Sequence, residues 1–462
     1  MTPRRAVTLA FAPIAIAIAS ISWASSPGAY VLRGTIVTPD KVVHDGSVLV
    51  VGDSIKEVGA SVNVPPGGTV VRVDGIILPG MIDLHDHLVW NVFPRWKPGA
   101  LFRDRYEWQD TEAYAAALKN PEGALVRSGL GCEMDRYAEI KAIVGGATSV
   151  VGSLSPSAED PHSNECIKGL ARNLDFYSDL YSTGVANNEP LWYEIFPLEM
   201  SVSLGADIRT GIESGKITCL LVHLAEGVDA SANREFAMLE AEGFVRPKTV
   251  IIQGVGLGAS EFKTMQKNSV GLVWSPRSNF ELYGATANVA AAKAAAVSIA
   301  IAPDWSPTGS SGMLNEVRYA SDWNRWQTPQ VFNDSNLVRM ATVVPAELAH
   351  VDSKIGSIAP QHYADLIVLR SRPGSPFSAA VQSGPADLKL VIVGGQPIYG
   401  DPSIMSKLLP GTQLEMHPVC GEQRAFNLAT QGSGESLAAT EQKLMAQLQG
   451  EKSALAPLQE CP

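Results

Sequence analysis

The middle of the chain, residues 78–350, alternates short apolar runs with helical patterns, and this feature constrains the fold most strongly. We expect strands at 80–84, 147–151, 217–222, 249–252, 271–274 and 297–302, and helices at 136–144, 233–242 and 286–296. Strands separated by helices form parallel sheets with crossover connections. The pattern therefore predicts an α/β fold, with one domain spanning residues 78–354.

Short β-branched runs flank this region on both sides. Residues 31–37, 46–51 and 69–73 precede it, and residues 364–369 and 390–395 follow it. Because a few short strands are not stable alone, the two groups are expected to combine. They predict one small β-sandwich built from residues 30–77 and 355–400. The polar segment 411–462, with an expected helix at 435–449, is predicted to be a C-terminal appendage.

Residues 1–24 have the character of a signal peptide. Arg4 and Arg5 precede an apolar stretch at 6–21, and Ser22, Trp23 and Ala24 resemble a small-x-small cleavage site. An uncleaved membrane anchor is the alternative, although the stretch is only marginally long enough to span a bilayer. We expect cleavage, a periplasmic or secreted protein, and no stable membrane span afterwards.

The cysteines and the net charge limit the environment and the partners. Cys132 and Cys166 flank one stretch and Cys420 and Cys461 another, so two disulfides are expected in an oxidising compartment, whereas Cys219 is expected to be a buried thiol. The net charge is −11, and no block of Lys and Arg suits a phosphate backbone. We predict a small-molecule substrate and no nucleic acid; a homo-oligomer stays open.

Two histidines follow the first expected strand of the central region. His85 and His87 are two residues apart, so in an extended chain they share a face while Asp86 points away. Two neutral imidazoles on one face can bind one divalent cation at about 2.0–2.1 Å. A pair of packed or surface histidines is the alternative; the preceding strand and Pro-Gly turn favour metal binding.

Two later strands also end in potential metal ligands. His223 closes the apolar run at 217–222, and Asp304 closes the run at 297–302. Active sites of α/β barrels form at such strand ends. A core histidine and a helix-capping carboxylate are the alternatives. Three imidazoles and one carboxylate, with a position left for water, describe a catalytic site for one divalent metal ion; zinc fits best, with iron or manganese as alternatives.

Glu226 lies three residues beyond His223. A divalent cation lowers the pKa of water toward about 7, and a nearby carboxylate can take the proton and deliver it to a leaving nitrogen. We predict this role for Glu226, with a solvated glutamate at the start of a helix as the alternative.

Taken in order, these motifs resemble the amidohydrolase superfamily, and within it the deaminase and chlorohydrolase branch. The resemblance spans roughly residues 30–400 and rests on the segments 79–87, 223–226, 274–279 and 302–305. It implies a (β/α)8 TIM-like barrel with His85, His87, His223 and Asp304 as metal ligands. It also implies Glu226 as the proton shuttle and hydrolysis of a C–N bond in an amide, a cyclic amide, or a ring amine or amidine.

One position departs from that branch. Its members carry a histidine at the end of the sixth strand, where this chain has Gln253 after the run at 249–252. A glutamine can orient a water molecule through hydrogen bonds but cannot transfer a proton. Either Glu226 and Asp304 perform all proton transfers, or the usual reaction has been lost. An exported metal-binding protein without turnover, or a hydrolase of esters or lactones, therefore remains an alternative.

Loops that follow the expected strands supply the candidate substrate contacts. Arg277 and Asn279 follow the strand at 271–274 and are predicted to hold a polar group of the substrate. Trp90 is predicted to bind substrate from the segment after His87, where Asn91, Arg103, Tyr106 and Trp108 are further candidates for a lid. Ordinary packing and surface ion pairs are the alternatives.

Overall fold

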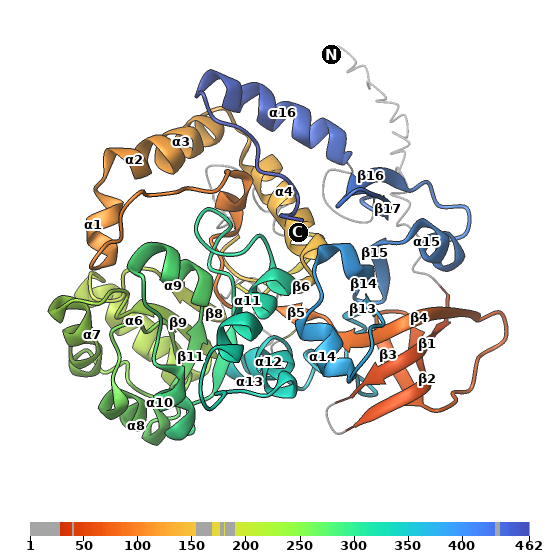
Figure 1. Ribbon diagram of the computed structural model, residues 1–462, viewed down its shortest axis with the longest axis horizontal. Helices are drawn as coiled ribbons and strands as arrows, with labels where there is room; N and C mark the ends of the chain where they lie inside the picture. The colour runs from red at the N-terminus through yellow and green to blue at the C-terminus, as the bar shows by residue number, and fades with distance from the viewer. Residues whose placement is uncertain are drawn as a thin grey trace, which may run out of the picture.

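A computed structural model describes residues 28–38, 41–153, 169–175, 180, 190–429 and 435–461. The predicted signal peptide, residues 1–24, lies outside the described residues. None of the helices in the described part has the length and apolar character needed to cross a bilayer. Figure 1 shows strands from both ends of the chain, in red and blue, side by side at one end of the molecule, with the central region beside them.

The first and last thirds of the chain form one mixed sheet, whose order is β16-β17-β15-β14-β13-β4-β1-β2-β3. Its strands are β1 (Tyr30–Val37), β2 (Val42–Val51), β3 (Ser54–Gly59), β4 (Thr69–Pro79), β13 (Leu366–Arg370), β14 (Leu388–Val393), β15 (Gln396–Gly400), β16 (Glu415–Val419) and β17 (Glu422–Phe426). The two ends meet where β4 pairs antiparallel with β13. Strands from both ends therefore combine as predicted, but in a single hydrogen-bonded sheet; two stacked layers of a β-sandwich are not shown.

The central region contributes two parallel sheets. One contains β5 (Met81–Ile82), β6 (Ala147–Val150) and β7 (Arg172–Asn173); the other contains β8 (Leu191–Glu194), β9 (Cys219–Leu224), β10 (Thr249–Gln253), β11 (Gly271–Trp274) and β12 (Ile299–Ile301). A parallel bridge between Asp86 and Asp304 links the end of β5 to the end of β12. The fold is thus TIM-barrel-like α/β, while the strand pairing among the described residues does not close a full barrel.

Helices surround these sheets (Figure 1). They are α1 (Arg105–Gln109), α2 (Glu112–Tyr114), α3 (Asn120–Arg127), α4 (Gly131–Val144), α6 (Val202–Ser214), α7 (Ala230–Ala241), α8 (Ala259–Lys267), α9 (Pro276–Tyr283), α10 (Val289–Ala294), α11 (Met313–Arg325), α12 (Asp334–Met340), α13 (Val343–Leu348), α14 (Pro376–Val381), α15 (Pro402–Leu408), α16 (Leu437–Gly450), and the short helices η1 (Leu88–Val92), η2 (Ala115–Lys119) and η4 (Pro385–Asp387). Asp104, Ser201, Asp229 and Ser436 accept backbone N–H groups at helix starts, which defines where these helices begin.

The alternation of side chains along β9 explains where His223 lies. Cys219 and Leu221 pack into an interior cluster with Ile82 of β5 and Val151, which directly follows β6, whereas Leu220 and Val222 pack on the opposite side. Side chains two residues apart share a face of a strand. His223 therefore continues the inward-facing row, at the carboxyl end of the strand.

The segment after α16 is fixed to the rest of the chain by a disulfide between Cys420 and Cys461, as predicted. Cys219 is a buried free thiol, also as predicted. Cys132 is disulfide-bonded. Its predicted partner, Cys166, lies outside the described residues.

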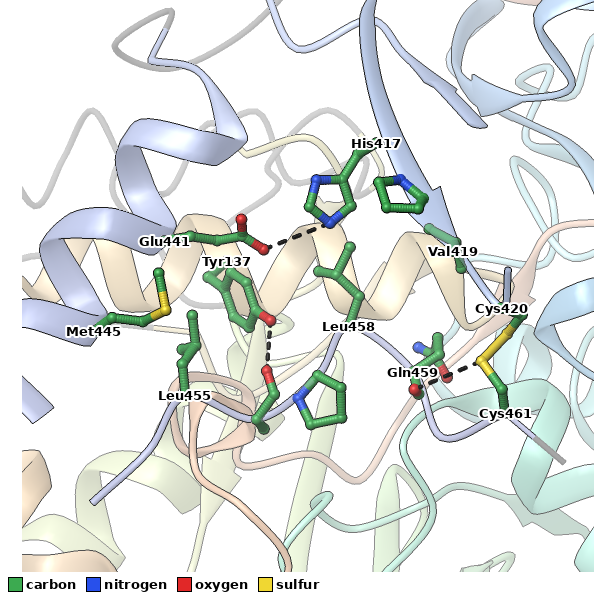
Figure 2. A pocket seen from close by; sticks show the side chains of 13 residues that line it. Tyr137, His417, Val419, Cys420, Glu441, Met445, Leu455, Leu458, Gln459 and Cys461 are labelled. Atoms are coloured by element: carbon green, nitrogen blue, oxygen red, sulfur yellow. Dashed lines mark hydrogen bonds and ion pairs between the residues drawn. A yellow bond between two sulfur atoms is a disulfide. The ribbon is translucent and has the colours of Figure 1, made fainter. Parts of the chain in front are cut away.

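A cavity of about 340 Å³ separates this C-terminal segment from α4, α16 and β16 (Figure 2). Tyr137 donates a hydrogen bond across it to the carbonyl of Ala456, and its lining includes none of the predicted site residues. Beyond the cavity, Gln459 donates to the backbone carbonyls of Lys141 and Ser311. The C-terminal segment therefore supports the loop that follows β12.

We expect loss of this disulfide to lower the stability of the protein. Cys420 and Cys461 are 41 residues apart, and closing a loop of that size contributes about 4 kcal/mol in the chain-entropy model. The double variant Cys420→Ser/Cys461→Ser should unfold at lower denaturant concentration than the parent, with Cys219→Ala as a control that leaves the crosslink intact. An unchanged midpoint would contradict the expectation.

Candidate active site

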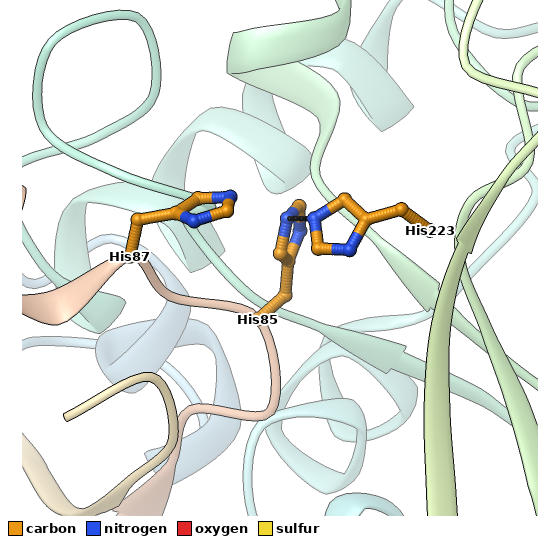
Figure 3. Close-up of side chains that lie close together, drawn as sticks. All are labelled: His85, His87 and His223. Atoms are coloured by element: carbon orange, nitrogen blue, oxygen red, sulfur yellow. Dashed lines mark hydrogen bonds between the residues drawn. The ribbon is translucent and has the colours of Figure 1, made fainter. Parts of the chain in front are cut away.

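His85, His87 and His223 converge, as Figure 3 shows. His85 and His87 follow β5 directly, and His223 lies on β9. One ring nitrogen from each lies within 4.8 Å of the others, and the Nε2 atoms of His85 and His223 are 3.1 Å apart. Asp86 points away and accepts hydrogen bonds from Asn91 at 2.8 and 3.0 Å. His85 and His87 therefore point to the same side and Asp86 to the other, as the spacing of the two histidines predicted.

The carboxylate of Asp304 completes this group. Its Oδ1 lies 3.1 Å from Nε2 of His85 and 3.5 Å from Nε2 of His87. Tetrahedral ligands held at about 2.0–2.1 Å from one ion are roughly 3.3 Å from each other. The separations of 3.1, 3.1 and 3.5 Å around His85 and Asp304 match that spacing, and imidazole with carboxylate is a donor set that zinc accepts. The residues present therefore fit one divalent ion.

The pKa values of two of the histidines suit metal binding. Burial lowers the pKa of His87 to about 4 and the pKa of His223 well below its usual value. Both rings are then neutral at pH 7, which is the form that binds metal. His85 Nδ1 lies 2.7 Å from the hydroxyl of Ser275, a partner that fixes the ring and leaves Nε2 free for a metal ion.

A relay of hydrogen bonds runs from Trp274 to Asp304. The indole N–H can only donate, and it donates to Oγ1 of Thr286 at 2.7 Å. Thr286 donates to Oδ1 of Asn279 at 3.0 Å, so the amide nitrogen of Asn279 faces Oε1 of Gln253 and donates to it. Gln253 then donates through Nε2 to Oδ2 of Asp304 at 3.0 Å. The indole N–H of Trp274, which can only donate, thus determines the orientation of the side-chain amides of Asn279 and Gln253.

This relay divides the two oxygens of Asp304 between different partners. Oδ2 accepts from Gln253 and, at 2.5 Å, from the hydroxyl of Ser278, whereas Oδ1 faces His85. Burial works to raise the pKa of Asp304, but the neighbouring His85 and His87 and the Ser278 hydroxyl lower it below its usual value. Asp304 is therefore ionised, with one oxygen held and the other available to a metal ion.

The backbone is strained at the strand ends that carry these groups. Gln253 has φ of 73° and Asp304 has φ of 74°, in the left-handed region that residues other than glycine seldom adopt. Such conformations are maintained by surrounding contacts and concentrate at functional sites. At both positions the side chain is tied into the relay, and the backbone N–H of Asp304 also donates to the carbonyl of His85 at 2.9 Å.

Glu226 is buried near this group. Burial raises its pKa to about 8; Asp304 adds to the shift, while Arg105 and a hydrogen bond from Tyr283 oppose it. The hydroxyl of Tyr283 donates to Oε1 of Glu226 at 2.7 Å. A carboxyl group whose pKa lies near neutrality can both accept and release a proton at physiological pH.

Trp90, predicted to bind substrate, joins an aromatic cluster beside the histidines. The cluster consists of Trp90, Trp96, Trp108, Tyr114 and Trp305. The ring of Trp305 lies 5.5 Å from that of His87 and 5.5 Å from that of Trp90. Trp305 thus brings this largely buried aromatic cluster against His87 of the candidate metal site.

The other predicted substrate contacts have partners within the protein. Arg277 forms an ion pair of 2.9 Å with Glu460 of the C-terminal segment. Asn279 is buried and its amide belongs to the relay. From the predicted lid, Arg103 is exposed and pairs with Glu107, whereas Asn91 holds Asp86. These contacts favour a role for Arg277 and Asn279 in supporting the site over direct substrate binding.

Sequence reasoning did not identify Ser275, Ser278, Thr286 or Tyr283. Ser275 and Ser278 lie within the 274–279 segment, but serines are common and carry no signal by themselves. Tyr283 is four residues after Asn279 on α9, and residues at that spacing share one face of a helix. That spacing is the signal through which Tyr283 could have been found.

The sequence profile described as the amidohydrolase family matches residues 203–398. Among curated proteins, the chain is 22% identical over 369 residues to a 5'-deoxyadenosine deaminase of Methanobrevibacter smithii, a match that covers 73% of this chain and 83% of that protein. It is also 24% identical over 333 residues to a 5-methylthioadenosine/S-adenosylhomocysteine deaminase of Bacillus cereus, covering 63% of this chain and 73% of that protein.

Solved structures share the fold. A zinc-bound adenosine deaminase from Xanthomonas campestris superimposes with a TM-score of 0.69 at 16% identity, over 92% of this chain and 99% of that one. A triazine hydrolase from Arthrobacter aurescens gives a TM-score of 0.67 at 15% identity, over 91% and 99% of the two chains. The family match over residues 203–398 and the curated relatives agree with the resemblance that the ordered motifs indicated.

Proposed function

We propose that this protein is a metal-dependent hydrolase that uses water to break a C–N bond of a small molecule, in a ring amine, an amidine, an amide or a cyclic amide. The convergence of the buried imidazoles of His85 and His223, the partly buried imidazole of His87, one ionised carboxylate and the buried Glu226 carries the proposal. The deaminases among its relatives support a ring amine or amidine as the first choice.

The roles of the side chains follow from their contacts. His85, His87, His223 and Oδ1 of Asp304 would hold one divalent ion, most simply zinc. When bound, such an ion acts as a Lewis acid and lowers the pKa of water. Glu226 takes a proton from the attacking water and delivers it to the leaving nitrogen, which departs as ammonia or an amine or, in a cyclic amide, stays as the amine of the ring-opened product. The aromatic cluster limits the access of bulk water to the reacting carbon.

In this proposal the protein is active with Gln253 in place of the histidine, and the glutamine does not mark a loss of turnover. Its amide oxygen accepts from Asn279 and its amide nitrogen donates to Asp304, so it contributes to the position of the Asp304 carboxylate. A histidine at this position would be a potential fifth ligand for the cation. Gln253 therefore suits a site in which Glu226 alone transfers protons.

We also infer that the two parallel sheets are parts of one eight-stranded barrel. Support comes from the bridge between Asp86 and Asp304 and from the interior cluster that both sheets share. An exported location is proposed on the signal-like residues 1–24, and the disulfide between Cys420 and Cys461 supports it.

We expect one divalent ion per chain and turnover that depends on it, because three imidazoles and one carboxylate are sufficient to hold a single ion. The test is elemental analysis of the protein together with ammonia release from a panel of ring amines, amidines and primary amides, and with the appearance of the ring-opened amino acid from cyclic amides. Esters and lactones in the same panel, followed by acid release, address the other bond types.

Removal of the ion by a chelator should abolish turnover, and zinc should restore it. Two ions per chain would contradict the single site. Turnover of esters alone, or activity that is insensitive to chelators, would contradict the proposed reaction.

A further inference from the structure

Three segments of the chain meet at the carboxyl group of Glu226. Glu226 follows β9, Tyr283 is the last residue of α9, and Trp108 lies on α1. All three side chains are buried. Their contact brings the segment after β5 and the segment after β11 to the same carboxyl group.

The hydrogen bonds among these groups have a fixed direction. The indole N–H of Trp108 donates to the hydroxyl oxygen of Tyr283 at 2.8 Å. Because an indole cannot accept and a tyrosine has one proton, Tyr283 directs that proton to Oε1 of Glu226, at 2.7 Å. Trp108 therefore orients the hydroxyl group, and the hydroxyl group holds one oxygen of Glu226.

The second carboxylate oxygen of Glu226, Oε2, is available for proton transfer. Among the described residues, no side chain donates a hydrogen bond to Oε2. The backbone of Glu226 is also held, since its carbonyl accepts from the N–H of Arg105 at 3.1 Å. With the backbone and Oε1 both fixed, the position of Oε2 is determined to within small rotations of the side chain.

We propose that Tyr283, oriented by Trp108, is the positioning residue for Glu226: it holds Oε1 so that Oε2 carries the proton between water and the leaving group. The proposal rests on the proposed function of Glu226 as the proton shuttle. It assigns a purpose to the aromatic residues Trp108 and Tyr283 beyond forming an apolar wall.

The same contact affects the protonation of Glu226. Charged and titratable groups approach Glu226 from several elements: Arg105 on α1, Glu235 on α7, Tyr283 on α9 and Asp304 after β12. Burial and the two acidic groups disfavour the carboxylate, whereas Arg105 and the Tyr283 hydroxyl favour it. Removal of the hydroxyl should therefore raise the pKa of Glu226 further.

The test compares Tyr283→Phe and Trp108→Phe with Tyr399→Phe, a control that removes another buried tyrosine hydroxyl, in this case from the nine-stranded sheet. In zinc-loaded protein, the acidic limb of the pH profile of kcat/KM should move to higher pH by roughly one unit in Tyr283→Phe. Trp108→Phe should move it less and in the same direction, and the control should not move it. Thermal unfolding verifies that each variant is folded.

A second measurement needs no substrate. The infrared carbonyl band of protonated Glu226, identified by its loss in Glu226→Gln, should titrate at higher pH in Tyr283→Phe than in the parent protein. A titration unchanged in both Tyr283→Phe and Trp108→Phe would overturn the proposal. A band that shifts as expected while Glu226→Gln retains full turnover would contradict the proposed role of Glu226 in the reaction. That result would still support the positioning of Glu226 by Tyr283.

Discussion

Glu226→Gln should retain its metal ion and lose turnover by roughly 10²–10⁴, the usual contribution of a positioned acid–base group. Glutamine keeps the size of the side chain and can still accept a hydrogen bond from Tyr283, so the surroundings are preserved. It cannot take up or release a proton at physiological pH. The measurements are kcat and KM on any substrate found in the panel, with metal content determined on the same samples.

Gln253→Ala is the matched comparison for this experiment. It removes an orienting hydrogen bond to Asp304 but no proton-transferring group, so turnover should fall by roughly fivefold, equivalent to about 1 kcal/mol. Gln253→His need not improve turnover, because an imidazole there can compete for the cation. If Gln253→Ala is more damaging than Glu226→Gln, the assignment of the proton shuttle is wrong.

Asp304→Asn should lose both the metal ion and turnover, with a fall in metal affinity of at least about 100-fold. The reason is the direction of the relay. Gln253 and Ser278 both donate to Oδ2 of Asp304, so an asparagine must place its oxygen there. Its NH₂ group, which cannot bind a cation, then faces the histidines. The measurement is zinc affinity by competition with a chromophoric chelator.

Ser278→Ala provides the control for Asp304→Asn. It removes one of the two donors to Oδ2 but leaves the carboxylate in place. We expect a fall in zinc affinity of roughly 10–100-fold at most, as for other residues that support metal ligands. Equal zinc affinity in Asp304→Asn and the parent protein would exclude Asp304 as a ligand.

The strands of the central region were predictable to different degrees. The runs that became β6, β9, β10, β11 and β12 are apolar because their residues are buried on both faces of a parallel sheet. The strands β7 and β8 were missed because Arg172 and Asn173 form one of them and a glutamate ends the other. The paired sheet at the chain ends was predictable from its β-branched runs, but its layering was not, since strand order depends on tertiary contacts.

The candidate site was likewise predictable only in part. The convergence of His85, His87 and His223 follows from the position of each residue at the end of a strand, a property that sequence can indicate. The partners of Arg277 and Asn279 could not be predicted in this way. Glu460 is 183 residues from Arg277, and the relay through Asn279 depends on side-chain orientations that only packing determines.

The pairing of β4 with β13 has a consequence for how the chain folds during synthesis. Val368 of β13 pairs with Ile77 of β4, so this contact joins residues almost three hundred positions apart. Until β13 has left the ribosome, the apolar edge of β4 has no neighbour on that side, and an open apolar edge is a template for aggregation. Contacts of such long range also form slowly. The strand β4 therefore gains its second neighbour only after about four fifths of the chain has been made.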